Sequence, residues 1–197
     1  MSNLMVDEQI KLLSKQLKIP TFAAYNEVVR HASADSDIGD LILMLMKNEY
    51  KQRQDNQNQR RLKLAGFPYT KTIDELDINR YSGEISELFI NELASCKFIM
   101  EHRNITMLGN PGRGKTHMAI ALGLKACSMG MTVYFKNAAS LSTELTEARD
   151  NYSLGRLENK IQRADLLMLD EIGYVSFDRY QSELLFKITY QKSDNFC

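Results

Sequence analysis

A glycine-rich segment near the middle of the chain has the residue types and spacing to hold a phosphate. It reads Gly109-Asn110-Pro111-Gly112-Arg113-Gly114-Lys115-Thr116 and fits the P-loop pattern G-x-x-x-x-G-K-[ST], called Walker A. The glycines let successive backbone N–H groups point at a phosphate, and the helix that follows adds the positive end of its dipole. Lys115 is expected to reach the β- and γ-phosphates of ATP, and the Thr116 hydroxyl to bind Mg²⁺. His117, in the next position, is counted with the nucleotide-binding residues rather than as a catalyst.

A second motif supplies two acids. The apolar run Leu166–Leu169 ends in Asp170 and Glu171, which is the form of a Walker B strand. Asp170 is expected to hold Mg²⁺ through water beside Thr116, and Glu171 to orient and polarise the attacking water. Two solvated acids at the end of a strand would look the same, but the P-loop upstream favours the Walker B interpretation. Lys115 and Glu171 are therefore the predicted catalytic residues for ATP hydrolysis.

A third feature is an excess of positive charge between residues 47 and 63, where only Glu49 and Asp55 are acidic. On a helix this excess could neutralise several DNA phosphates, and amides such as Gln52 would suit contacts to the backbone. A solvated helix face would carry the same charges, so the residues alone leave both interpretations open. The six candidate DNA-binding residues are Lys47, Lys51, Arg53, Arg60, Arg61 and Lys63.

Composition gives weaker constraints. Lys+Arg and Asp+Glu are 25 each, so the formal net charge of zero indicates no particular partner. The three cysteines are far apart, without metal-ligand spacing, and indicate reduced thiols in the cytoplasm. The N-terminus does not resemble a signal peptide, and no apolar run is long enough to span a bilayer. We expect a cytoplasmic protein with no membrane partner.

The elements that must position these motifs fall into two parts. Residues 1–65 show helical spacing throughout and predict a small all-helical domain, a candidate for binding DNA or a partner. Residues 66–82, with two helix breakers, are predicted as a linker. From residue 83 to 197 strands alternate with helices, which predicts a parallel α/β sheet with helices on both faces. The predicted strands are 105–108 before the P-loop, 132–135, and 166–169, the last buried on both faces.

At three segments the chain resembles the IstB-type ATP-binding proteins, transposition helpers of bacterial insertion sequences and relatives of the DnaC helicase loader. The resemblance runs to about Phe186. It implies an AAA+ ATPase that uses ATP and Mg²⁺, forms a homo-oligomer on double-stranded DNA with little sequence preference, and directs a partner transposase to its target. The segments are Gly109–Thr116, Asp170–Tyr174 and Arg61–Pro68.

The resemblance also shows what this sequence lacks. A complete core of that class has five parallel strands in the order 5-1-4-3-2, and only the first three can be found here. The P-loop strand should lie between strands four and five, so both of its neighbours are among the missing ones. A sensor residue and an arginine finger are also missing, and we expect weak or absent ATP hydrolysis. A truncated or frameshifted reading frame, favoured by the unfamiliar ending, or a longer protein cut short would account for this.

Other functions remain open at this stage. A helicase loader would share the same ATP site and differ only in its client protein. A non-hydrolysing ATP-binding fragment would keep nucleotide affinity without turnover. A small-metabolite kinase is the least favoured, because no segment looks like a lid or a set of substrate-binding arginines.

Overall fold

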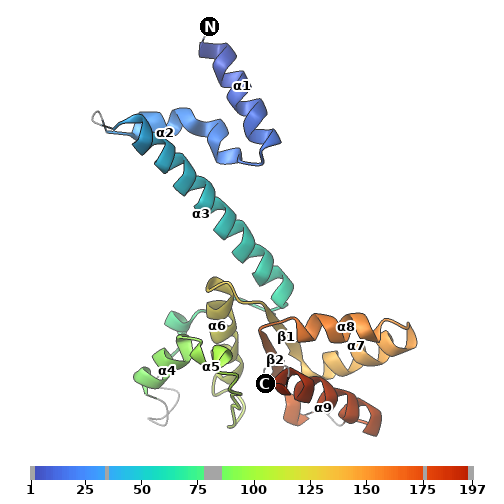
Figure 1. Cartoon of the computed structure of the whole chain (residues 1–197). Helices are drawn as coiled ribbons and strands as arrows, with labels where there is room; N and C mark the ends of the chain where they lie inside the picture. The colour runs from blue at the N-terminus through green and yellow to red at the C-terminus, as the bar shows by residue number, and fades with distance from the viewer. Residues whose placement is uncertain (1–2, 34–35, 78–85, 175–176, 195–197) are drawn as a thin grey trace. The chain divides into compact units, whose positions relative to one another are not determined.

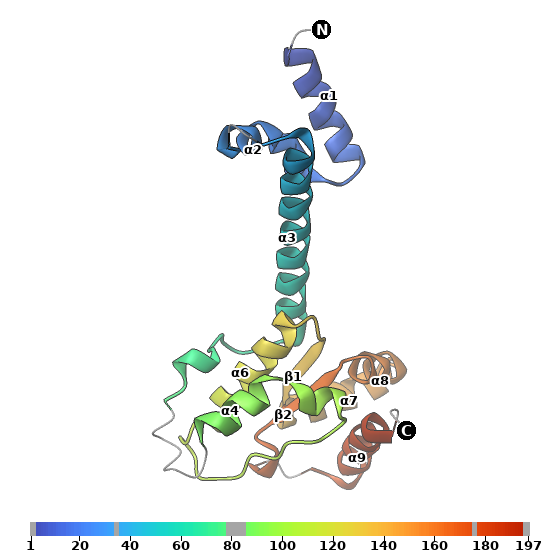
Figure 2. The ribbon, with the colours of Figure 1, turned by 60° about the vertical axis from the view of Figure 1, so that its left-hand side comes forward.

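The computed structural model describes residues 3–33, 36–77, 86–174 and 177–194, and the chain forms two compact units, 1–59 and 60–197 (Figures 1 and 2). No described helix is both long and apolar enough to cross a membrane. The strands are β1 (Val133–Asn137) and β2 (Leu166–Asp170), and short 3₁₀ turns include η1 (Pro20–Ala24), η2 (Ile73–Glu75) and η4 (Ile172–Tyr174). The α-helices are α1 (Asn3–Gln16), α2 (Tyr25–His31), α3 (Ile38–Ala65), α4 (Glu87–Ala94), α5 (Lys97–Met100), α6 (Lys115–Ser128), α7 (Ala138–Asp150), α8 (Leu154–Gln162) and α9 (Arg179–Asp194).

The first unit is helical, as its spacing predicted. α1 ends near a turn in which Lys18 has a φ of 57°, and Pro20 then opens η1 instead of a regular helix. Pro20 has the fixed φ that suits the first position of a helical turn. α2 follows without a side-chain cap, because its N-cap residue is Ala24; the Thr21 hydroxyl donates to Glu49 on α3.

The second unit is built on a parallel pair of strands with helices on both faces, which confirms the predicted α/β class. β1 and β2 pair in parallel, with Val133 opposite Leu166 and Asn137 opposite Asp170. Because side chains alternate along a strand, Val133 packs with Ala126 and Cys127 of α6, whereas Tyr134 packs with α7, α8 and α9. The carboxyl ends of both strands therefore meet at one edge, beside the start of α6.

The predicted strand at 105–108 is wrong. Residues 103–110 form neither helix nor strand, and Leu108 is 89% exposed. A strand exists through hydrogen bonds to a neighbour. The described residues supply no partner strand here, because their sheet contains only β1 and β2. β2 is likewise half-buried along its whole length instead of buried on both faces.

The approach of α6 to the sheet depends on a glycine. A Cβ atom at Gly123 would lie 2.7 Å from Phe67 Cζ and 2.8 Å from Met168 Sδ, distances that real Cβ atoms do not show. Gly123 therefore lets α6 lie close against β2. The segment after α3 closes the other side of α6, where Leu76 is buried with Met118.

Two cysteines lie deep in this core. Cys96 and Cys127 are fully buried, free thiols that pack with Ala65, Ala126 and Val133. Burial raises the pKa of the Cys127 thiol to about 11, and burial likewise raises the pKa of Cys96. Both thiols therefore stay protonated and unreactive in the folded protein.

Candidate nucleotide-binding site

The loop at residues 109–114 has the curled backbone expected of a phosphate cradle. Gly112 and Gly114 have φ angles of 79° and 86°, in the left-handed region that side chains disfavour. Gly114 is the N-cap of α6, so the loop leads directly into the positive end of that helix. The loop therefore has the backbone shape and the helix N-terminus that are typical of anion-binding turns.

Lys115 closes the loop on itself. Its Nζ donates hydrogen bonds to the carbonyl oxygens of Gly109 at 2.6 Å and Asn110 at 2.9 Å. These bonds hold the ammonium inside the curve of the loop, where the phosphates of a nucleotide would need a positive charge. Asn110, Pro111 and Arg113 are exposed on the loop.

The two motifs meet in space. Thr116 Oγ1 donates to Asp170 Oδ1 over 3.1 Å, although the residues are 54 positions apart. Asp170 ends β2, and Thr116 lies in the first turn of α6, which Gly123 holds close to that strand. One hydroxyl and one carboxylate at this separation fit Mg²⁺, which takes few protein ligands and completes its shell with water and phosphate oxygens. Across the described ranges no group of three His, Cys, Asp or Glu side chains forms a metal cage.

Asn137 is a site residue that the sequence reasoning missed. Its Nδ2 donates to Glu171 Oε2 at 2.5 Å, so the predicted water-activating acid is held from the neighbouring strand. Glu171 itself has a φ of 58°, and its N–H donates to Asp170 Oδ1 at 3.1 Å. The available signal was position: Asn137 ends β1, and the carboxyl ends of parallel strands share one edge of a sheet.

His117 connects the start of α6 to the segment after α3. Its Nε2 lies 3.2 Å from the carbonyl oxygen of Thr72, which can only accept, so Nε2 carries the proton. Thr72 and Glu75 form a capping box at η2. The Thr72 backbone N–H, then its hydroxyl and the nearby His117, lower the pKa of Glu75. His117 therefore follows Thr116 in sequence but contacts the Thr72 carbonyl oxygen. Its role in nucleotide binding stays a prediction.

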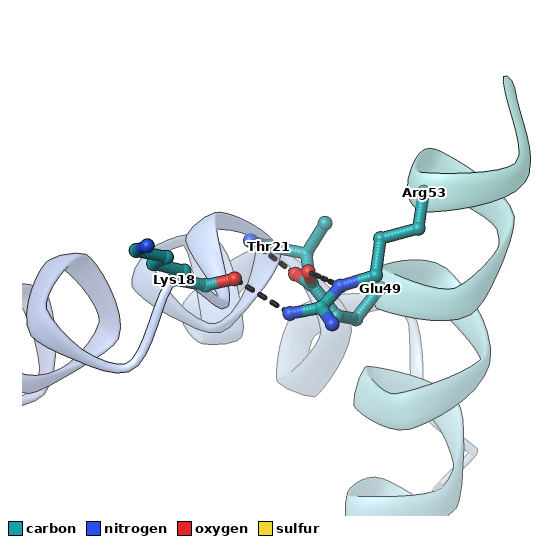
Figure 3. A network of polar contacts seen from close by, with 4 residues as sticks. All are labelled: Lys18, Thr21, Glu49 and Arg53. Atoms are coloured by element: carbon teal, nitrogen blue, oxygen red, sulfur yellow. Dashed lines mark hydrogen bonds and ion pairs between the residues drawn. The ribbon is translucent and has the colours of Figure 1, made fainter. Parts of the chain in front are cut away.

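Two of the six predicted DNA-binding residues, Arg53 and Arg61, lie against other parts of the protein. Arg53 Nε donates to Glu49 Oε1 at 2.7 Å, and its Nη2 donates to the Lys18 carbonyl oxygen at 2.6 Å (Figure 3). Glu49 also accepts from the Thr21 hydroxyl at 2.6 Å, so one buried carboxylate joins α3 to the turn after α1. The guanidinium of Arg61 lies beside Gly130, at the end of α6. Arg53 is nevertheless exposed, as are Lys47, Lys51, Arg60 and Lys63.

Comparison with known proteins places the chain among ATP-binding proteins of insertion sequences. The family model of the IstB-like ATP binding proteins matches residues 12–195. A Pseudomonas aeruginosa protein named for ATP binding and for insertion sequence IS21 is 31% identical over 182 residues, covering 91% of this chain and 68% of its own. The corresponding protein of insertion sequence IS5376 from Geobacillus stearothermophilus is 32% identical over 186 residues, covering 92% and 72%.

Proposed function

The chain belongs to the family of IstB-like ATP-binding proteins, and we propose that it binds MgATP at the P-loop, assembles on double-stranded DNA and directs the transposase of an insertion sequence. The observation that carries the ATP part is the meeting of Thr116 with Asp170 at 3.1 Å beside a P-loop closed by Lys115. The family match and the names of the relatives support the insertion-sequence part. They give no comparable support to a helicase loader. We place this activity in the cytoplasm.

Each residue of the site has a proposed role. The backbone of Gly109–Thr116 would surround the phosphates, Lys115 would neutralise their charge, and His117 would brace the first turn of α6 from the side. Thr116 and Asp170 would hold Mg²⁺, which supplies charge neutralisation between the phosphate oxygens. Glu171 would orient the attacking water, and Asn137 would keep its carboxylate in place. Lys115 and Glu171 are the residues on which hydrolysis would depend most.

The proposed DNA contacts are the exposed basic side chains of α3. Lys47, Lys51, Arg60 and Lys63 would neutralise phosphates without reading sequence, so binding should weaken steeply with salt. Arg53 and Arg61 are engaged with other parts of the protein and are less suited to this role. ATP-dependent assembly of several copies on the duplex would then present the transposase with its target.

A nucleotide titration with and without Mg²⁺ tests the site. Lys115→Ala should reduce affinity for fluorescent ATP at least about tenfold, since it removes charged hydrogen bonds to the phosphates. Thr116→Val and Asp170→Asn should weaken binding of MgATP but leave binding in EDTA nearly unchanged. Thr143→Val is a matched control, because the Thr143 hydroxyl donates only to the Ala139 carbonyl on α7. Equal affinities for the Lys115→Ala variant and the parent chain would refute the ATP site.

The DNA and transposase parts need their own measurement. DNA binding should require ATP, should fall with rising salt, and should recruit the transposase of the same insertion sequence. Recruitment of a replicative helicase instead would favour the loader function.

A further inference from the structure

The end of α6 that lies away from the P-loop carries basic residues from three segments of the chain. Lys125 is exposed in the last turn of α6, and Lys97 is exposed as the first residue of α5. The end of α3 adds Arg60, Arg61 and Lys63, of which Arg61 is half-buried and the other two are exposed. All five residues belong to the unit 60–197. Together they form the α6-end surface.

One core cluster holds the three segments against each other. It contains Ala65 from α3, Cys96 from the start of α5 and Cys127 from α6. Burial raises the pKa of both thiols, whereas the charges of Arg61 at Cys127 and of Lys125 at Cys96 act in the opposite direction. Because Coulomb interactions weaken with distance, both cations lie near this cluster. The basic side chains of the three segments therefore gather on one part of the unit.

Acidic residues are missing from the segments that build this surface. The sequence contains no Asp or Glu from residue 56 to 73, from 93 to 100, or from 102 to 143. Asp165 borders the region, where its carboxylate accepts hydrogen bonds from the N–H and the hydroxyl of Thr132. Glu101, after α5, pairs with Arg103. The whole chain has a net charge of zero, so the positive charge here is a local segregation.

The four exposed members of the surface have no carboxylate within ion-pair distance among the residues that the structure describes. In the same unit, four other cations each pair with an acid: Lys136, Arg149, Arg179 and Lys187. Helix dipoles favour cations at the ends of α3 and α6, but Lys97 begins α5, where a dipole disfavours positive charge. Stabilisation of helix ends therefore does not account for the whole surface.

We propose that the α6-end surface binds the phosphates of duplex DNA, with Lys97 and Lys125 taking part beside the basic end of α3. Cations that no acid neutralises can replace the counterions of DNA phosphates, and the release of those counterions favours binding. Contacts of this kind hold the DNA backbone and carry no sequence information. The inference rests on the proposed DNA binding, but it adds a contact on the ATP-binding unit itself, at the far end of the helix that begins at the P-loop.

Titration of the full chain and ATP with a fluorescent duplex, at several salt concentrations, tests the surface. Lys97→Met with Lys125→Met should lower the slope of log affinity against log salt by about 1.8, since each phosphate contact contributes about 0.9. Lys97→Arg with Lys125→Arg should keep the slope, because the charges remain. The matched control is Arg179→Met with Lys187→Met, which removes the same charge from cations that pair with acids. An unchanged slope in the first variant, or an equal fall in the control, overturns the proposal.

The same titrations separate this proposal from the proposed function. The Lys97→Met, Lys125→Met variant should bind ATP as tightly as the parent chain, and circular dichroism shows whether it is folded. If the parent chain binds no duplex, the DNA part of the proposed function fails and this contact fails with it. If Lys47→Met with Lys51→Met lowers the slope but the change at Lys97 and Lys125 does not, only the additional contact is wrong.

Acetylation of lysine amines in the full chain, followed by mass spectrometry, locates the contact directly. Duplex DNA should slow the modification of Lys97 and Lys125, because phosphates cover their ammonium groups. Lys187, which pairs with Glu158 on another part of the unit, should react at the same rate with and without DNA. Unprotected Lys97 and Lys125 in the DNA-bound protein would overturn the proposal.

Discussion

Asn137 Nδ2 donates a hydrogen bond to Glu171 Oε2 over 2.5 Å, across the carboxyl ends of the two paired strands. The other amide atom, Oδ1, accepts from the Ala139 N–H at 2.9 Å and caps α7. One side chain therefore caps a helix and at the same time holds Glu171, the acid next to Asp170.

Asn137→Asp separates these two tasks. A carboxylate keeps the cap but cannot donate to Glu171, and it places two like charges in contact. We expect a loss of about 1 kcal/mol in the free energy of unfolding, most of it recovered when Glu171→Gln is added. Asn137→Ala, which loses the cap as well, should not be rescued by Glu171→Gln. Thermal unfolding of the four variants measures this, and no rescue of Asn137→Asp would contradict the contact.

Arg53 should behave as a structural residue of the first unit. Arg53→Met leaves the buried Glu49 and the Lys18 carbonyl without their charged donor, at an expected cost of about 1–3 kcal/mol in stability. Lys51→Met, on an exposed part of the same helix, is the matched control for stability. In DNA titrations Arg53→Met should leave the slope of log affinity against log salt unchanged. Loss of Lys47 or Lys51 should reduce that slope by about 0.9 each.

Glu49 should make the first unit sensitive to acid. Burial opposes the ionisation of Glu49, but hydrogen bonds from Thr21 and Arg53 outweigh it and lower its pKa. Because the folded pKa lies below the unfolded value of about 4.3, its contribution to stability is complete above about pH 5 and is lost as the pH falls through the folded value. Glu49→Gln should flatten the fall of the melting temperature between pH 5 and 3. Glu8→Gln, exposed on α1, is the control; an equal effect of both changes would contradict the assignment.

Gly123 should tolerate no side chain. Gly123→Ala places a methyl group against Phe67 and Met168 and should destabilise the second unit by about 1–3 kcal/mol. Gly155→Ala is the matched control, since that glycine lies in α8 with nothing within 4 Å of the position that the new methyl group would take, and it should gain up to about 1 kcal/mol. Chemical denaturation of both variants gives the comparison. A stable Gly123→Ala protein would show that α6 can move away from β2.

The sequence predicted the parts of the site that are local. The P-loop, the start of α6 and the end of β2 follow from motifs within a few residues, and the structure brings Thr116 to Asp170 as expected. The helices of the first unit and the two paired strands also follow from periodicity. These features depend on short-range geometry, which a single sequence contains.

The rest required tertiary context. Residues 105–108 have the composition of a strand, but a strand needs a partner that periodicity does not reveal. By sequence, Arg53 is one more basic residue between residues 47 and 63, where Glu49 is one of two acids. Only the structure shows that Arg53 and Glu49 form an ion pair. Asn137 carried no motif at all, and only the register of β1 against β2 places it beside Glu171.

The buried thiols of Cys96 and Cys127 make the opening of the second unit's core measurable by thiol labelling. A thiol reagent can reach Cys127 only during transient opening of the core between α6 and the sheet, so its labelling rate reports the population of the open state. Cys127 lies near the end of the helix whose beginning forms the P-loop. A nucleotide bound at the beginning of α6 should therefore slow the labelling of Cys127 near its end. The slowing should increase with the ratio of the nucleotide concentration to its dissociation constant.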